Sequence, residues 1–170
     1  MFEAMRFYIR WVERTNKIVG TITMYGIFAM LFVLGWSIAA KSLALPALWT
    51  LDISQFLMVS YFLLGGGYSL QQDGHVRMDL LWGTLPPRKQ SWVDTLTVFC
   101  MIFYIIILLY GGLGSTMYSI EYGERGFSAW RPLMWPIKVT MCVGITLMLL
   151  QAFAMLFRDI LRISGRETTA

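Results

Sequence analysis

Four long apolar runs, separated by short polar stretches, constrain the fold of this chain more than any other feature of its sequence. The first, Ile18–Ala40, has about 23 residues. As a helix it would span about 34 Å, against about 30 Å for the hydrocarbon core of a bilayer. Three further runs follow at 53–70, 95–119 and 137–157. Because backbone amides and carbonyls inside a bilayer must be paired within their own segment, we predict an all-α integral membrane protein with four transmembrane helices.

The composition supports lipid as the solvent of these runs. Of the 170 residues, 57% are hydrophobic and 14% are charged, whereas soluble domains carry about 25% charged residues. A cleavable signal peptide is the alternative for the first run, but its apolar region would have about 7–15 residues and a small-residue cleavage site would follow it. We therefore expect the first run to be retained, and residues 1–170 to form a single membrane domain.

Positive charges predict the orientation of the chain. Lysines and arginines cluster before the first run, between the second and third, and after the fourth, ten in all, whereas the opposite side carries four. Because basic residues are enriched in cytoplasmic loops, we predict that both termini, including the tail 158–170, are cytoplasmic. This placement explains the net charge of +4 without nucleic-acid binding. The ten are Arg6, Arg10, Arg14, Lys17, Arg77, Arg88, Lys89, Arg158, Arg162 and Arg166, and the four are Lys41, Arg125, Arg131 and Lys138.

The N-terminal segment 1–17 mixes apolar and aromatic side chains with charged ones. This composition is typical of helices that lie in the membrane interface, so we predict a short surface helix that contacts membrane lipids. The apolar residues do not all fall on one helical face. A plain cytoplasmic extension of the first transmembrane helix therefore stays open as the alternative.

The residue types indicate neither catalysis nor a cofactor or metal site. The two cysteines, Cys100 and Cys142, fall inside apolar runs as packing residues would. The one histidine, His75, lies in a loop, whereas a haem ligand would be needed at membrane depth. Transporters that bind a charged cargo usually place ionisable residues inside their spans, but here the most polar residues within the spans are Gln55 and Gln151. We therefore do not expect an enzyme, nor a chain that moves a charged solute alone.

Glycines mark two of the apolar runs. The second run contains Gly65, Gly66 and Gly67, and the third contains three more glycines at 111, 112 and 114. Small residues allow two helix backbones to approach closely, so we predict helix-packing surfaces at both places. The partner can be another helix of this chain or a second protein, and spacing alone does not decide between them.

The densest polar stretch, 71–81, directly follows the second run. Its run from Gly74 to Asp79, preceded by a glycine-rich helix and by Trp49-x-x-Asp52, resembles the small Q-type (DctQ-like) membrane subunit of tripartite ATP-independent periplasmic (TRAP) transporters. Pro86-Pro87-Arg88 and the four spans with both termini inside extend the resemblance over nearly the whole chain. The residues that carry it are Trp49, Asp52, Gly65, Gly66, Gly67, Gly74, His75, Arg77 and Asp79. Many relatives have two adjacent acidic residues after the tryptophan where this chain has only Asp52, which puts in doubt any role that requires a carboxylate pair.

The resemblance implies a complex of three components in the bacterial inner membrane. A soluble periplasmic protein captures an organic acid, a large M-type membrane subunit imports it with sodium, and this chain would be a scaffold for the large subunit. We expect His75, Arg77 and Asp79 to stabilise the cytoplasmic ends of the second and third spans. Two alternatives stay open: a self-sufficient small transporter that works as a homo-oligomer, and the membrane anchor of a redox enzyme.

The predicted periplasmic stretches, 41–49 and 121–135, combine charges with prolines and aromatic residues. Charges steer the encounter of two proteins and aromatic side chains supply contact area, so we expect these stretches to touch the periplasmic binding protein. The charged candidates are Glu121, Glu124, Arg125 and Arg131. The alternative is that the arginines extend to the membrane surface and the tryptophans only mark the interface.

Overall fold

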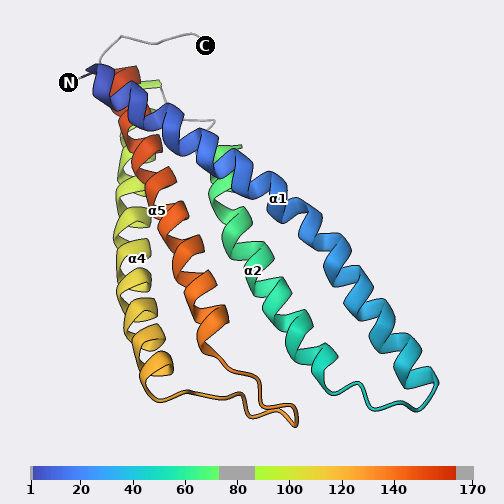
Figure 1. The fold of residues 1–170 in the computed structure, drawn as a ribbon. Helices are drawn as coiled ribbons and strands as arrows, with labels where there is room; N and C mark the ends of the chain where they lie inside the picture. Colours follow the sequence, from blue (N-terminus) through green and yellow to red (C-terminus); the bar gives the residue numbers. More distant parts are fainter. Residues whose placement is uncertain (1, 73–86, 164–170) are drawn as a thin grey trace.

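The computed structural model describes residues 2–72 and 87–163, and these form four long helices (Figure 1). They are α1 (Phe2–Ser42), α2 (Trp49–Gln71), α4 (Pro87–Glu121) and α5 (Trp135–Ile163). Each is long and apolar enough to cross a membrane, which confirms the predicted all-α fold with four transmembrane helices. Within the described residues the only β-type pairing is an isolated bridge between Arg125 and Leu133.

Each predicted span lies inside one helix. Residues 18–40 belong to α1, 53–70 to α2, 95–119 to α4 and 137–157 to α5. Residues 2–17 are helical and continue into the first span without a break, so α1 is 41 residues long, as the alternative of an extended first helix expects. The location of residues 2–17 in the membrane interface stays a prediction.

Local sequence explains where several helices begin and end. Pro87 is the first residue of α4 and Pro136 the second of α5, positions at which the missing backbone N–H costs no helical hydrogen bond. After α1, Ala44 has a left-handed φ of 54°, and the Leu45 amide donates to the Ala40 carbonyl at 2.9 Å. This pattern closes the helix, and Pro46 then prevents its continuation.

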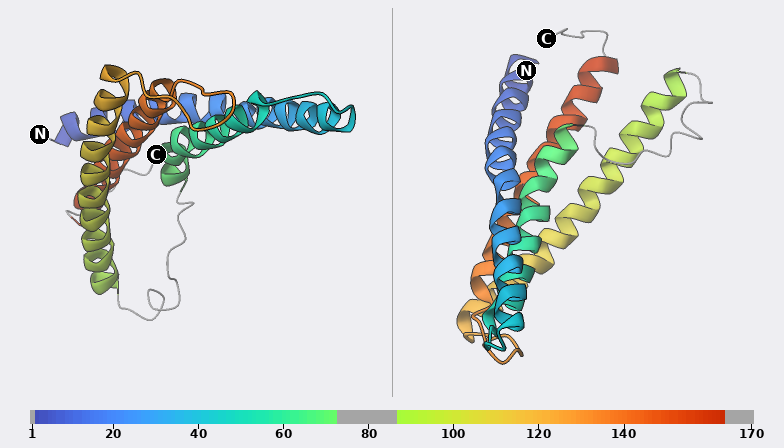
Figure 2. Two further views of the ribbon diagram at one scale, coloured as in Figure 1. Left: turned by 90° about the horizontal axis from the view of Figure 1, so that it is seen from below. Right: turned by 90° about the vertical axis from the view of Figure 1, so that its right-hand side faces the viewer.

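Helix α5 is the centre of the arrangement. It packs against α1, α2 and α4, and α1 also packs along α2, whereas α4 packs extensively only against α5. Seen from below, α1 and α2 run in one direction and α4 in another (Figure 2, left). The four helices therefore form an open, angled layer and not a closed bundle. Helix α1 begins and α5 ends at one end of the molecule, and the loops that follow α1 and α4 lie at the other (Figure 1).

Two apolar clusters hold the layer together. One lies mainly between α4 and α5 and has Ile102, Ile105 and Ile145 among its buried residues. The other joins the start of α1 to the end of α5 through Val12 and Ala154. An ion pair between Glu13 and Arg158 adds to this second junction, as does the Tyr8 hydroxyl, which donates to the Leu150 carbonyl at 3.3 Å. The first turns of α1 are thus packed on α5.

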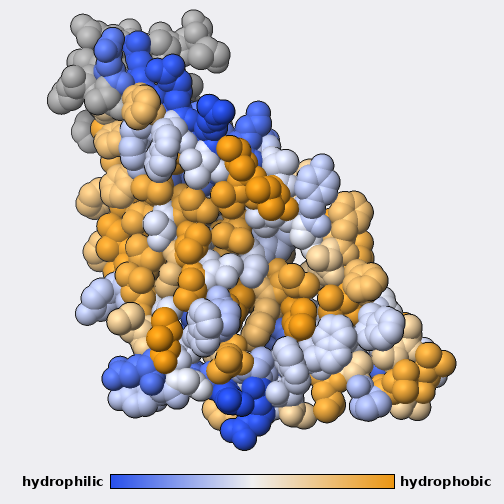
Figure 3. Space-filling view, viewed as in Figure 1, coloured by the Kyte–Doolittle hydropathy of each residue, from blue (hydrophilic) through white to orange (hydrophobic). Residues whose placement is uncertain are grey.

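Most of the apolar surface remains uncovered. Large side chains such as Phe32 (73% exposed) and Tyr110 (82% exposed) point away from the layer. On the face drawn in Figure 3, hydrophobic residues cover the middle of the molecule, and hydrophilic residues gather at its two ends. A soluble monomer rarely exposes a continuous apolar surface of this extent, but a protein surrounded by lipid or by other membrane helices does.

Candidate functional site

The start of α2 is bound to the loop between α4 and α5. Asp52, in the first turn of α2, accepts a hydrogen bond of 2.6 Å from the hydroxyl of Ser128. The preceding residues are also fixed, because the hydroxyl of Thr50 is 3.0 Å from that of Ser37 on α1. Trp49 is partly buried in the same turn. Trp49 and Asp52 therefore lie where α1, α2 and the second loop meet.

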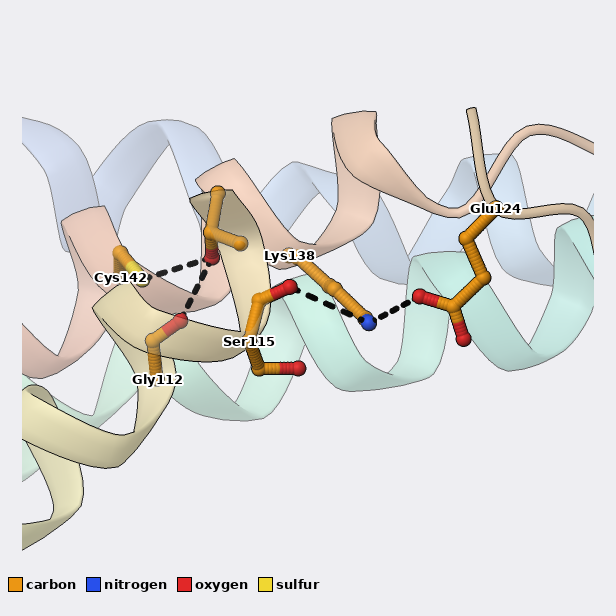
Figure 4. A network of polar contacts seen from close by, with 6 residues as sticks. Gly112, Ser115, Glu124, Lys138 and Cys142 are labelled. Atoms are coloured by element: carbon orange, nitrogen blue, oxygen red, sulfur yellow. Dashed lines mark hydrogen bonds and ion pairs between the residues drawn. The ribbon is translucent and has the colours of Figure 1, made fainter. Parts of the chain in front are cut away.

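A lysine bridge fixes the other side of this loop. Lys138, in α5, donates at 2.5 Å to the Glu124 carboxylate and at 3.5 Å to the Ser115 carbonyl near the end of α4 (Figure 4). The hydrogen bond from Lys138 is the largest cause of a lowered pKa at Glu124, which favours its charged form. Deeper in the same helix pair, the Thr116 hydroxyl lies 3.2 Å from the Cys142 sulfur. The Glu124 amide also donates to the Ser119 carbonyl of α4 at 3.2 Å, so Glu124 is tied to both flanking helices.

The other three charged candidates of this region face outward. Glu121 is the last residue of α4, and Arg125 and Arg131 lie in the loop, and all three are exposed. Among the described residues, Glu124 is the one of these four that forms an ion pair. The structure therefore separates the candidates into one half-buried carboxylate paired with a lysine and three exposed charges.

The three consecutive glycines of α2 have different surroundings. A Cβ at Gly65 would approach only the Thr23 methyl group, at 3.9 Å, which is an ordinary contact. A Cβ at Gly66 would lie 2.8 Å from the sulfur of Met148 on α5, and one at Gly67 would lie 2.8 Å from Oδ1 of Asn16 on α1. Gly66 and Gly67 are therefore places where a neighbouring helix approaches closely, and both neighbours belong to this chain.

Gly67 leaves room for a buried pair of amide side chains. Asn16, from α1, donates from Nδ2 to Oε1 of Gln151, from α5, at 2.8 Å. Both side chains are fully buried, with exposures of 1% and 0%. The remaining amide atoms, Oδ1 of Asn16 and Nε2 of Gln151, have no hydrogen-bond partner among the described residues. Three helices thus meet at one polar contact, and this contact depends on the absence of a side chain at position 67.

Sequence reasoning missed two features of these crossings. Gly144 of α5 lies against the backbone of Leu63 in α2, and a Cβ there would be 2.8 Å from both the carbonyl carbon and the carbonyl oxygen. Asn16 stands just before the first apolar run, where its burial has no local signal in the sequence. The only signals in the sequence were a glycine inside the fourth apolar run, for the close crossing, and the polar Gln151 in the same run, for the buried amide pair.

Four residues of the predicted motif, Gly74, His75, Arg77 and Asp79, lie outside the described residues. Among the residues that the structure does describe, no group of three or more histidine, cysteine or acidic side chains is arranged to hold a metal ion. Cys142 is buried and Cys100 is exposed, and neither forms a disulfide. The polar contacts of the described part connect helices and loops to one another.

These features define a class of protein: a multi-pass helical membrane protein with an open helix layer and large uncovered apolar faces. A family model described as "Tripartite ATP-independent periplasmic transporters, DctQ component" matches residues 30–162, more than half of the chain. The chain therefore belongs to the DctQ family, the small membrane components of TRAP transporters. The search of curated proteins finds no match.

Membership of this family has two direct consequences. Members of this family are components of transporters and not enzymes. A member of the family works within a complex of three parts, together with a larger membrane component and a binding protein. The match begins inside α1, so the first 29 residues, including Asn16, lie outside the matched range.

Proposed function

We propose that this chain is the small scaffold subunit of a sodium-coupled TRAP transporter that imports organic acids across the bacterial inner membrane. The observation that carries the proposal is the family match over residues 30–162. Sodium coupling and an organic-acid cargo follow from the family resemblance. The cargo itself would be chosen by the two other components.

The open helix layer supports a scaffold role. Among the described helices, α4 packs extensively only against α5, so the described residues leave most of its circumference open to lipid or to a second membrane protein. Its outward face includes Phe103 (62% exposed) and Ile107 (54% exposed). In a bilayer such a face gains packing energy by contact with another helix, since lipid alone packs less closely around it. We propose that the large M-type subunit covers part of this exposed surface.

The orientation is part of the proposal. With ten basic residues on one side and four on the other, both termini are cytoplasmic and the loops 43–48 and 122–134 are periplasmic. The second loop then lies on the side from which the binding protein delivers its cargo. We propose that the edge formed by 41–49 and 121–135 contacts that protein.

The motif after α2 is proposed to act at the cytoplasmic side. We propose that Arg77 pairs with Asp79 or with lipid phosphate and that His75 bonds to nearby backbone, so that the ends of the second and third spans are stabilised. Alanine substitution at these positions should lower the amount of assembled complex more than it changes substrate affinity. A large change in affinity with normal assembly would contradict this role.

Uptake by the reconstituted system tests the proposed function. Proteoliposomes contain the large component alone, this chain alone, or both, and uptake of a labelled carboxylic acid is measured with the binding protein and an inward sodium gradient. We expect uptake only where both membrane components are present. Uptake by this chain alone would show a self-sufficient transporter, and a bound haem spectrum in the purified chain would indicate a redox anchor. Either result would overturn the proposal.

A further inference from the structure

The loop between α4 and α5 is a closed hairpin, residues 124–134. The Gly126 amide donates to the Pro132 carbonyl at 2.8 Å, and the Met134 amide donates to the Glu124 carbonyl at 3.0 Å. Between these bonds, the chain turns where the Arg131 amide donates to the Ser128 carbonyl at 3.1 Å. Backbone bonds of this kind give the hairpin one defined shape.

Side-chain contacts hold the hairpin to the helices. Lys138 of α5 binds Glu124 at the base of the hairpin, at 2.5 Å. Asp52 of α2 accepts the hydrogen bond of Ser128 near its tip, at 2.6 Å. The hairpin is therefore fixed at two points, one on α5 and one on α2, and it cannot move away from the helices without breaking a charge-assisted contact.

The tip of this fixed hairpin carries an exposed apolar residue that lies between two cationic residues in the sequence. Phe127 is 107% exposed, so the described part of the chain leaves it as open as a residue in an extended peptide. Arg125 and Arg131 on either side are exposed, and the described residues provide no ion-pair partner for them. Arg131 also has a φ of 49°, a left-handed conformation that is strained for an arginine. Such strain persists where the surrounding contacts impose it, and strained residues cluster at functional sites.

We propose that the 124–134 hairpin is a preformed docking element that inserts Phe127 into an apolar pocket with an acidic rim on the soluble binding protein. The proposal rests on the proposed function, which supplies this partner and the periplasmic side. An aromatic ring that fills a pocket is a typical centre of binding energy. Arg125 and Arg131 match acidic groups around that pocket and speed the encounter.

A folded protein fits this hairpin better than a lipid surface does. A pocket requires the aromatic ring in one position, and the hydrogen bonds within the hairpin supply that position before binding, which lowers the entropy lost on association. Insertion of an aromatic ring among lipid headgroups requires no defined backbone shape. A lipid partner would therefore not account for the hydrogen bonds within the hairpin, its two fixed points or the strained Arg131.

Binding of the purified binding protein to the assembled transporter in nanodiscs tests the proposal. The variant Phe127→Ala should raise Kd at least about tenfold, chiefly through a faster dissociation rate. The double variant Arg125→Glu, Arg131→Glu should slow association at low salt, with a smaller effect at high salt. Phe7→Ala is the matched control, because Phe7 is also an exposed phenylalanine (68%) but lies near the start of α1, outside the stretches 41–49 and 121–135. It should leave Kd unchanged.

A fluorescent label at position 127 separates protein from lipid as the partner. In a Phe127→Cys variant that lacks the two native cysteines, an environment-sensitive dye should emit as in water and shift to the blue when the binding protein is added. A blue-shifted emission in nanodiscs without binding protein would show that the tip is already in lipid, and the docking role would be wrong.

The docking role and the scaffold function can fail separately. If wild-type transporter binds the protein and Phe127→Ala binds it equally well, or if the wild type shows no binding, the hairpin is not a docking element. The scaffold function is judged by the uptake experiment above, which needs this chain whether or not Phe127 contributes. All variants are first shown to co-purify with the large component in wild-type amount.

Discussion

Substitution of Gly67 by alanine should destabilise the chain, although alanine is the better helix former. The new Cβ would lie 2.8 Å from Oδ1 and 3.1 Å from Cγ of Asn16, and both distances are shorter than the usual contacts of a Cβ atom. Asn16 must therefore move, and its 2.8 Å hydrogen bond to Gln151 is lost or distorted. Gly65→Ala is the matched control in the same helix, because its Cβ would meet only the Thr23 methyl group at 3.9 Å.

The expected loss in the free energy of unfolding for Gly67→Ala is estimated from three contributions. One extra methyl group in a well-packed region costs about 1–3 kcal/mol. Loss of an interhelical hydrogen bond in a membrane protein costs about 0.6 kcal/mol on average and up to about 1.7. The change from glycine to alanine inside a helix returns about 1 kcal/mol. Gly67→Ala should thus lower the free energy of unfolding by about 1–3 kcal/mol, whereas Gly65→Ala should leave it unchanged or raise it by up to about 1 kcal/mol.

Thermal unfolding of the purified chain in detergent, followed by tryptophan fluorescence, measures the difference. We expect a midpoint on the order of 5 °C lower for Gly67→Ala and no decrease for Gly65→Ala. Combination with Asn16→Ala, which removes the clashing group, should cost less than the sum of the two single changes. Equal stability of the two glycine variants, or strict additivity in the double variant, would refute the close approach of α1 and α2 at this point.

Three further predictions concern other parts of the structure. Gly144→Ala should destabilise the chain more than Gly114→Ala in the same unfolding assay, because its Cβ would meet the α2 backbone at 2.8 Å, whereas a Cβ at Gly114 would have no described atom within 4 Å. Similar midpoints would contradict the crossing of α2 and α5. The pKa of Glu124 is lowered in the folded chain, so its contribution to stability is present above the ordinary carboxyl pKa and is lost as pH falls through the lowered value. Glu124→Gln should therefore weaken the pH dependence of the unfolding midpoint in that acidic range. An unchanged pH profile would count against the contact between Glu124 and Lys138. In a cysteine-free background, a membrane-impermeant thiol reagent applied to intact cells should label Phe127→Cys but not Arg10→Cys, and the reverse pattern would invert the topology.

The helices were predictable because a transmembrane span is a local property. Length and apolar content alone indicated that 18–40, 53–70, 95–119 and 137–157 are helical, and the structure places each inside a helix. The continuity of α1 from Phe2 to Ser42 was open, since charged and apolar residues alternate through its first turns. Its attachment to α5 through Val12 and Ala154 decides that these turns are packed and not free, and that contact joins opposite ends of the chain.

The contacts of the candidate site depend on how the helices cross, and the sequence does not show this. The three glycines of α2 look equivalent in the sequence, yet only Gly66 and Gly67 lie against a neighbouring helix closely. The partner of Asp52 is Ser128, 76 residues away, so its role as an attachment point for the hairpin could not be read from the motif around Trp49. Phe127 was overlooked for a similar reason, because an exposed aromatic residue has meaning only once the hairpin that presents it is known.

Co-purification from native membranes tests the central claim most directly. The chain carries an affinity tag at its C-terminus, is expressed at its natural level, and is extracted in a mild detergent. We predict that one large multi-span membrane protein is retained with it in a fixed ratio, and that the tagged complex restores organic-acid uptake to cells that lack the chain. Elution of the chain alone or as a homo-oligomer, from membranes that contain the large component, would contradict its assignment as the small subunit of such a complex.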